Sequence, residues 1–319
     1  MMKLLNSIET ALDEMLKGLL LAQPGEYERI ENEYSYALVK KCRKPEKVRI
    51  MVNGGGGWGP LFPGVVGEGL ADAMVHGDFN CAPNAWLIYQ TGKEIQEGKG
   101  IFILTNNYSG DYLNNDMARE LLSREDIPSY VCYVSDNVCS AKGEGKEKRG
   151  GMTGIGILLK IAAALADQGA GLEEMAEIVE KANARLRTIA VCCSEEDGAV
   201  EYGNGFSGEP PAGRERFISA DHTAANILDY LLPELETYKA EDKFHIMVNR
   251  MKKMSYLEGY VMVNALNREL VRRGYKAGSC TVGSYFDAFE TNGCIVSVMA
   301  YDTQLEPYLR PVKGYDFTI

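Results

Sequence analysis

Residues 48–60 read VRIMVNGGGGWGP, an apolar run followed by one asparagine, four glycines and a turn that ends in proline. The run 48–52 is typical of a buried strand that ends at a turn signal. Glycine lets the backbone come close to a ligand, and ligands of open α/β sheets bind beyond the carboxyl ends of the strands. The stretch therefore predicts an α/β fold with a small-molecule pocket at this turn.

Two further polar turns follow strand-like runs. Residues 100–105 (GIFILT) lead into 106–111 (NNYSGD), and the glycine-rich segment 203–210 (GNGFSGEP) comes soon after the run 188–193 (TIAVCC). The right-handed crossover rule for parallel strands places the turns at 53–60 and 106–111 on the same edge of one sheet. We therefore expect the three turns to surround one pocket.

The composition is that of a soluble globular protein. The 319 residues are 45% hydrophobic and 25% charged, and the chain is long enough for two domains. The net charge of −11 argues against nucleic acid, because phosphate binding needs clustered Lys and Arg. The eight cysteines show neither metal-ligand nor disulfide spacing, which predicts reduced thiols in a cytoplasmic protein without a bound metal. We expect neither a signal peptide nor a membrane-spanning helix.

Strand-like and helical patterns alternate along the chain, beginning with an amphipathic helix at 5–22. In the first half we expect strands at 48–52, 100–105 and 129–135 and helices at 85–97, 113–124, 151–168 and 172–186. In the second half we expect strands at 188–193, 245–249, 276–283 and 293–301 and helices at 221–233 and 257–273. The alternation predicts parallel strands with helices on both faces. We infer two α/β domains, residues 1–182 and 183–319, with 194–220 as an irregular loop that reaches the pocket.

Two nucleotide-binding motifs are matched poorly. Gly54, Gly56 and Gly59 satisfy G-x-G-x-x-G after a strand, but Pro60 and Pro63 interrupt the turn where a dinucleotide-binding helix would begin. A P-loop sequence is absent, so any nucleotide is expected on another chain.

A serine hydrolase is also disfavoured. The segment 205–209 (GFSGE) is close to a nucleophile elbow but ends in glutamate instead of glycine. Of the three histidines, we interpret His245 at the head of an apolar strand as structural and His222 at a helix start as a capping residue. We expect only His76, in the loop after the first glycine-rich turn, to lie within reach of the pocket.

Asp111 is the most informative single residue, because it follows a strand and a Ser-Gly turn and precedes the helical stretch 112–123. Two compatible interpretations stay open. As an N-cap, it would tolerate Asn with a stability change below about 1 kcal/mol. As a pocket carboxylate, it would accept a hydroxyl proton or bind a polyol.

Taken together, these motifs resemble the K subunit of dihydroxyacetone kinase, the ketose-binding subunit of phosphotransferase-system-dependent kinases. The resemblance runs nearly end to end, through the N-terminal helix, the turn to Pro60 and the segments 107–111 (NYSGD), 149–151 (RGG), 208–210 (GEP) and 282–285 (VGSY). It implies glycerone kinase activity in glycerol metabolism. It also implies a homodimer of two α/β domains that binds no cofactor itself, with ATP and Mg²⁺ on an all-helical L-type partner subunit.

The chain departs from this family at three pocket positions. Its first turn is one residue shorter than the family's G-G-G-S-G-H-E-P and has Trp58-Gly59 in place of His-Glu. Asn106 stands where the family's K-N-Y-T-G-D has its lysine. Ser207 stands where the family's G-I-H-G-E-P has the histidine that traps the ketone covalently. Serine is an unactivated nucleophile without an evident base here, so the resemblance does not extend to covalent capture.

Two hypotheses follow from the resemblance and these departures. The first is a divergent substrate-binding subunit that holds a small polar, hydroxylated ligand non-covalently for phosphorylation by the partner. The second is a catalytically inactive paralogue that senses a ligand and binds a transcriptional regulator. In the first hypothesis Asp111 is the base or acceptor, and the remaining residues bind or orient the ligand: Gly55, Gly56, Gly57, Trp58, Asn106 and Ser207.

Overall fold

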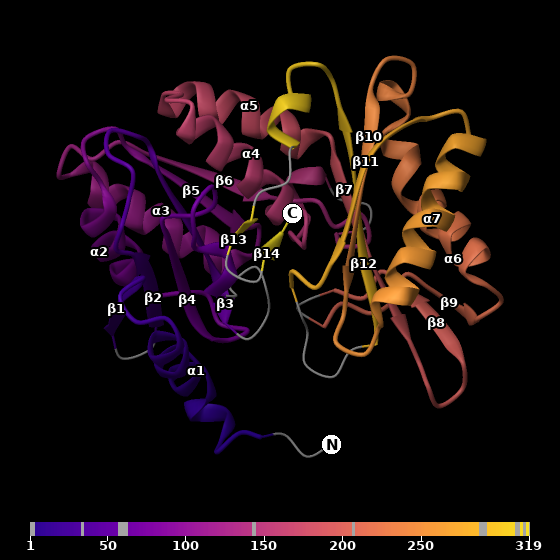
Figure 1. Cartoon of the computed structure of the whole chain (residues 1–319), viewed down its shortest axis with the longest axis horizontal. Helices are drawn as coiled ribbons and strands as arrows, with labels where there is room; N and C mark the ends of the chain where they lie inside the picture. The colour runs from indigo at the N-terminus through magenta and orange to yellow at the C-terminus, as the bar shows by residue number, and fades with distance from the viewer. Residues whose placement is uncertain are drawn as a thin grey trace.

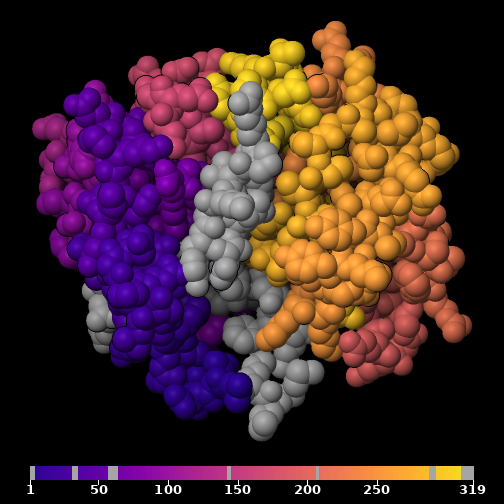
Figure 2. Space-filling model, in the orientation of Figure 1, coloured from indigo at the N-terminus to yellow at the C-terminus, as the bar shows by residue number. Residues whose placement is uncertain are grey.

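The computed structural model describes residues 4–32, 35–56, 63–141, 145–205, 208–286 and 292–309, and the short strands β13 (Lys313–Gly314) and β14 (Phe317–Thr318). Two six-stranded sheets stand side by side, the first from the N-terminal half and the second from the C-terminal half (Figure 1). The same two halves form the indigo and the orange lobes of the surface (Figure 2). Both halves are α/β, as the sequence predicts.

The first sheet has the order β1-β2-β4-β3-β5-β6, with β4, β3, β5 and β6 parallel and β1–β2 as an antiparallel edge. Its strands are β1 (Tyr27–Asn32), β2 (Ser35–Lys40), β3 (Arg49–Gly56), β4 (Ala73–Phe79), β5 (Ile101–Asn106) and β6 (Ser129–Val134). Because β3 and β5 are parallel neighbours, the segments that follow them leave from the same edge, as the crossover rule predicts.

Helices cover both faces of the first sheet. One face packs against α2 (Ala85–Ile95) and α3 (Ser109–Ser123). The other packs against α1 (Ile8–Ala22), α4 (Ile155–Asp167) and α5 (Leu172–Ala184). Among the helices of the described residues, none is long and apolar enough to cross a membrane.

The second sheet has the order β11-β10-β12-β7-β8-β9, and only β10 and β11 are parallel. The expectation of parallel strands is therefore wrong for most of this sheet, because β12 inserts antiparallel between β10 and β7. Its strands are β7 (Leu186–Cys193), β8 (Ala199–Tyr202), β9 (Gly213–Arg216), β10 (Lys243–Arg250), β11 (Lys276–Gly283) and β12 (Gly293–Tyr301). The segment expected as a loop at 194–220 contains the β8–β9 hairpin, whose four-residue strands are too short to give a periodic signal.

The outer face of the second sheet packs against α6 (Ala220–Leu231) and α7 (Tyr256–Arg272). Its inner face meets the first domain, since Met247 and Met299 share one core with buried residues of α4 and α5. Short 3-10 helices complete the chain at Pro63–Val65, Lys146–Lys148, Leu232–Glu234, Glu236–Tyr238 and Glu306–Leu309.

Asp136 ties the two sheets together at the centre of the molecule. Its buried carboxylate accepts the backbone N–H groups of Met152 at 2.6 Å and Gly154 at 3.0 Å, and its carbonyl accepts that of Thr188 at 2.8 Å. The end of β6, the start of α4 and the strand β7 are therefore held by one residue.

Candidate functional site

The glycine run that follows residues 48–52 begins inside β3, since the strand extends to Gly56. A Cβ on Gly55 would lie 3.3 Å from the backbone of Asn80, and one on Gly56 would lie 2.5 Å from the carbonyl oxygen of Gly77. Gly56 is therefore needed for the close approach of β3 to the segment that ends β4, and Gly55 leaves little room for a side chain. Their role toward a ligand stays a prediction, and Gly57 and Trp58 lie outside the described residues.

A reciprocal amide pair fixes the first turns of α3 over β3. Asn53 donates to Asn115 Oδ1 at 2.8 Å, and Asn115 donates to Asn53 Oδ1 at 2.9 Å and to the carbonyl oxygen of Asp111 at 2.8 Å. Asn53 and Asn115 are fully buried. This pair, which the sequence patterns do not single out, holds Asp111 at the carboxyl edge of the sheet.

Asp111 is the third residue of α3 and not its N-cap. The cap position is Tyr108, and Ser109 and Gly110 are already helical. The side chain of Asp111 is 6% exposed, and among the described residues its Oδ1 has no hydrogen-bond partner. Burial raises the pKa of this carboxyl to about 7, so it can hold or release a proton near neutral pH. The interpretation as a cap is wrong, whereas the role of Asp111 as a pocket carboxylate stays a prediction.

Asn106 ends β5 beside the segment 149–151, which belongs to another of the family motifs. Asn107 Nδ2 donates to the carbonyl oxygen of Arg149 at 2.8 Å, and Tyr108 Oη donates to that of Gly151 at 3.2 Å. Asn106 is 5% exposed, and its Oδ1 has no partner within the described part of the chain. A Cβ on Gly151 would lie 2.3 Å from that oxygen, so this glycine gives the amide its room.

His76 lies in β4 and not in a loop, so the expected location is wrong, although the strand borders the glycine run of β3. Its ring is buried, with Nδ1 2.7 Å from the carbonyl oxygen of Gly77. Burial lowers the pKa of His76, which keeps the imidazole neutral.

The other two histidines lie in the second half of the chain. His245 Nδ1 lies 2.8 Å from Ser279 Oγ, and burial lowers the pKa of His245 to about 3, which fits the structural role expected. His222 does not cap α6, because the N-cap is Ser219, whose side chain accepts a hydrogen bond from the backbone N–H of His222. The Nε2 atom of the His222 ring lies 3.1 Å from the carboxylate of Glu215.

The second glycine-rich segment follows β8. Gly203 has a φ of +85°, a conformation that favours glycine, and its N–H donates to the carbonyl oxygen of Ala190 at 2.7 Å. Ser207 lies outside the described residues, so its place in the pocket stays a prediction.

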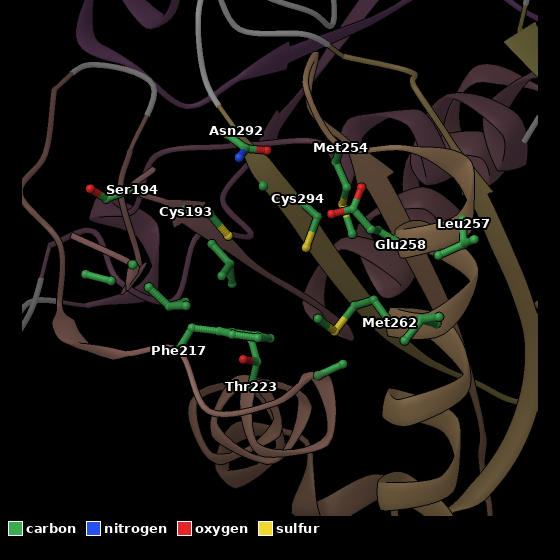
Figure 3. Close-up of a pocket in the computed structure, with 17 residues that line it drawn as sticks. Cys193, Ser194, Phe217, Thr223, Met254, Leu257, Glu258, Met262, Asn292 and Cys294 are labelled. Atoms are coloured by element: carbon green, nitrogen blue, oxygen red, sulfur yellow. The ribbon is translucent and has the colours of Figure 1, made fainter. Parts of the chain in front are cut away.

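A separate cavity of about 430 Å³ opens on the outer face of the second sheet, between α6 and α7 (Figure 3). Phe217, Leu257, Met254, Met262 and Cys294 line it. None of the predicted site residues does, and its largely apolar lining does not suit a hydroxylated ligand. In the part of the chain that the structure describes, no cluster of three or more His, Cys, Asp or Glu side chains is arranged to hold a metal ion.

The fold and these buried polar groups define a class: a two-domain α/β protein with unpaired acceptors at the end of β5 and in the first turn of α3. The chain belongs to the Dak1 domain family, whose model matches residues 17–313.

Named relatives agree with this membership. The chain is 30% identical, over 97% of its length and 96% of the relative's, to the dihydroxyacetone-binding subunit of PTS-dependent dihydroxyacetone kinase 2 of Listeria innocua. It is 29% identical to a D-erythrulose kinase of Mycolicibacterium smegmatis, of which it spans 55%. The fold matches a solved structure described as regulation of the dha operon of Lactococcus lactis, with a TM-score of 0.87, 24% identity and coverage of 98% and 96% of the two chains.

Proposed function

We propose that this chain is the substrate-binding subunit of a dihydroxyacetone-kinase-like system. It holds a small hydroxylated ketose or polyol without a covalent bond and presents it to ATP and Mg²⁺ on a separate, all-helical subunit. Family membership supports the class of activity. The observation that carries the proposal for this chain is Asp111, a buried carboxyl with a pKa near 7 and an unpaired oxygen.

In this reaction the chain itself supplies only the proton acceptor and the position of the substrate. The ionised carboxylate of Asp111 takes the proton of a substrate hydroxyl, whose oxygen attacks the γ-phosphorus of ATP while ADP leaves. Phosphoryl transfer depends mainly on positioning and charge stabilisation, and the partner supplies both for the phosphates. Loss of the family histidines therefore does not by itself remove the reaction.

The binding is expected to be non-covalent because Ser207 stands where the family has its trapping histidine. A crystal soaked with dihydroxyacetone should show ligand density detached from the side chain at 207. Continuous density from Ser207 Oγ to the carbonyl carbon would overturn this part of the proposal.

Calorimetric titration of the purified chain with dihydroxyacetone and with erythrulose, followed by a phosphorylation assay with an L-type subunit and ATP, tests the proposal. Asp111→Asn should weaken binding by about 10- to 100-fold, since hydrogen bonds to a charged group contribute about 1.5–3 kcal/mol. Turnover should fall further than affinity, because a base acts in the transition state. The matched control is Asp116→Asn, one turn further along α3, where the carboxylate accepts from Tyr133 Oη at 3.1 Å and is 41% exposed.

The replacements at 58 and 207 favour a second function, that of a ligand sensor that binds a transcriptional regulator. Such a protein would bind the same ligands, lose affinity in Asp111→Asn and show no turnover with any L-type subunit. Intact binding and activity in Asp111→Asn would contradict both functions.

A further inference from the structure

The cavity of about 430 Å³ on the outer face of the second sheet has a floor of strands and walls of helices (Figure 3). Cys294 of β12 lies opposite Val191 of β7, and Cys193 is two residues further along β7, so their side chains share the floor. Residues one turn apart line the walls: Leu257, Glu258, Val261 and Met262 on α7, and Ala220 and Thr223 on α6. Small-molecule sites have volumes of about 300–1,000 Å³, so this cavity has the size of a ligand site.

The lining is apolar and partly open to solvent. Phe217, Leu257 and Val261 are 54%, 72% and 46% exposed. Exposed apolar side chains around a hollow are typical of a binding site, because a ligand that covers them removes apolar surface from water. Met254 and Met262 add flexible side chains that can adapt to the shape of a ligand. The body of the ligand is therefore apolar.

Glu258 adds one negative charge to this lining. Its Oε2 accepts hydrogen bonds from the backbone N–H of Ser255 at 2.8 Å and from the Ser255 hydroxyl at 2.6 Å. These bonds lower the pKa of Glu258, so the carboxylate is ionised at neutral pH. Burial and the charge of Glu258 both raise the pKa of Cys193 on the cavity floor. The carboxylate therefore acts on the cavity, and Figure 3 shows it on the side of α7 that faces Cys294.

The charge of Glu258 is not balanced by a basic side chain of the described residues. The only groups that lower its pKa there are the hydroxyl and the backbone N–H of Ser255. Two cations from the segment before α7 are held by other groups. Lys253 Nζ lies 3.1 Å from Glu195, and the guanidinium of Arg250 lies 3.6 Å from the centre of the Tyr256 ring. An apolar ligand with one positive charge would supply the missing counter-charge.

We propose that this cavity is a second ligand site, which binds a small amphiphilic cation, an ammonium group on an alkyl or aryl-alkyl body. The ammonium group pairs with Glu258, and the apolar body lies against Val191 and Met262. An anionic amphiphile such as a fatty acid would meet the same carboxylate with a like charge. The site is independent of the proposed function, because none of the residues predicted to bind the hydroxylated substrate lines this cavity.

Calorimetric titration of the full chain with n-octylammonium, n-octanol and n-octanoate, each below its micelle concentration, tests the proposal. The three probes share one chain length and differ in charge. We expect octylammonium to saturate a single site and to bind at least about fivefold more tightly than octanoate, the factor that a partly exposed ion pair can contribute. Binding of octanol should be intermediate. This comparison uses the unmodified protein, so it does not depend on the folding of any variant.

Variants locate the site. Glu258→Gln keeps a capping box with Ser255 and removes only the charge, so it should weaken octylammonium binding by about three- to fivefold and leave octanol binding unchanged. The matched control is Asp221→Asn, which removes an exposed carboxylate at the start of α6 that pairs with Arg268 and should change neither affinity. Leu257→Lys, at an exposed position, places a competing cation beside Glu258 and should abolish octylammonium binding.

Two results would overturn the inference. The first is the absence of saturable octylammonium binding, or octanoate binding that is equally tight. The second is octylammonium binding that stays unchanged in both Glu258→Gln and Leu257→Lys, because the probe would then lie elsewhere. Neither result affects the proposed function, which depends on Asp111 and ketose binding.

Discussion

Replacing Asp111 with asparagine should stabilise the folded protein while it weakens ligand binding. The carboxyl is buried, one of its oxygens has no partner among the described residues, and its pKa is raised from the ordinary value of 3.8 to about 7. One pKa unit corresponds to about 1.4 kcal/mol, so ionisation of Asp111 costs the folded state about 4 kcal/mol at most. Asn has the shape of the protonated acid and carries no charge to desolvate. We expect Asp111→Asn to raise the free energy of unfolding by about 2–4 kcal/mol at pH 8.

The gain should depend on pH in a defined direction. The folded pKa lies above the unfolded one, so the folded state binds the proton more tightly, and the contribution of Asp111 to stability is fully present below pH 3.8. This contribution is lost as the pH rises toward 7, and above pH 7 the free energy of unfolding no longer changes through Asp111. The variant and the natural protein should therefore be about equally stable near pH 4 and should separate steadily up to pH 7.

Urea unfolding followed by fluorescence, at intervals between pH 4.5 and 8, measures this difference. Asp116→Asn on the same helix serves as the control and should change stability by less than about 1 kcal/mol, because its carboxylate is partly exposed. A less stable Asp111→Asn at pH 8, or a difference that does not change with pH, would refute the reasoning. The interpretation of Asp111 as an N-cap predicts instead a change below about 1 kcal/mol, because Asn caps a helix about as well as Asp.

Three further predictions concern the scaffold. Gly151→Ala should destabilise the protein by about 1–3 kcal/mol and weaken ligand binding, because its Cβ would lie 2.3 Å from Asn106 Oδ1. Gly18→Ala in α1, where a Cβ would meet no atom within 4 Å, should stabilise the protein by about 0.5–1 kcal/mol. Thermal melts of the two variants measure both changes. Asp136→Ala should cost about 3 kcal/mol or more in urea unfolding, because it leaves the buried N–H groups of Met152 and Gly154 unpaired; a loss below 1 kcal/mol would contradict the central role of this residue. Light scattering in the presence of a chelator should give twice the chain mass, since the resemblance implies a homodimer and the sequence suggests no metal; a monomer there would refute it.

Local patterns in the sequence identified much of the first domain. The runs 48–52, 100–105 and 129–135 are strands, and the segments that follow the first two leave from one edge, because apolar runs, turn residues and crossover handedness are properties of short stretches. Asp111 was singled out for the same reason, by its place after a strand and a turn.

Tertiary structure decided everything that depends on which distant segments meet. The charged hairpin β1–β2 and the antiparallel insertion of β12 give no local signal, since strand order is set by packing between residues far apart in the chain. His76 lies beside the glycine run of β3 because β4 pairs with β3. Asp111 is buried, with one oxygen unpaired among the described residues, in a helix that the Asn53–Asn115 pair fixes over the sheet. Residue types and their spacing can be read from the sequence. Burial arises only when the chain folds, and burial determines both the pKa values and which polar atoms lack a partner.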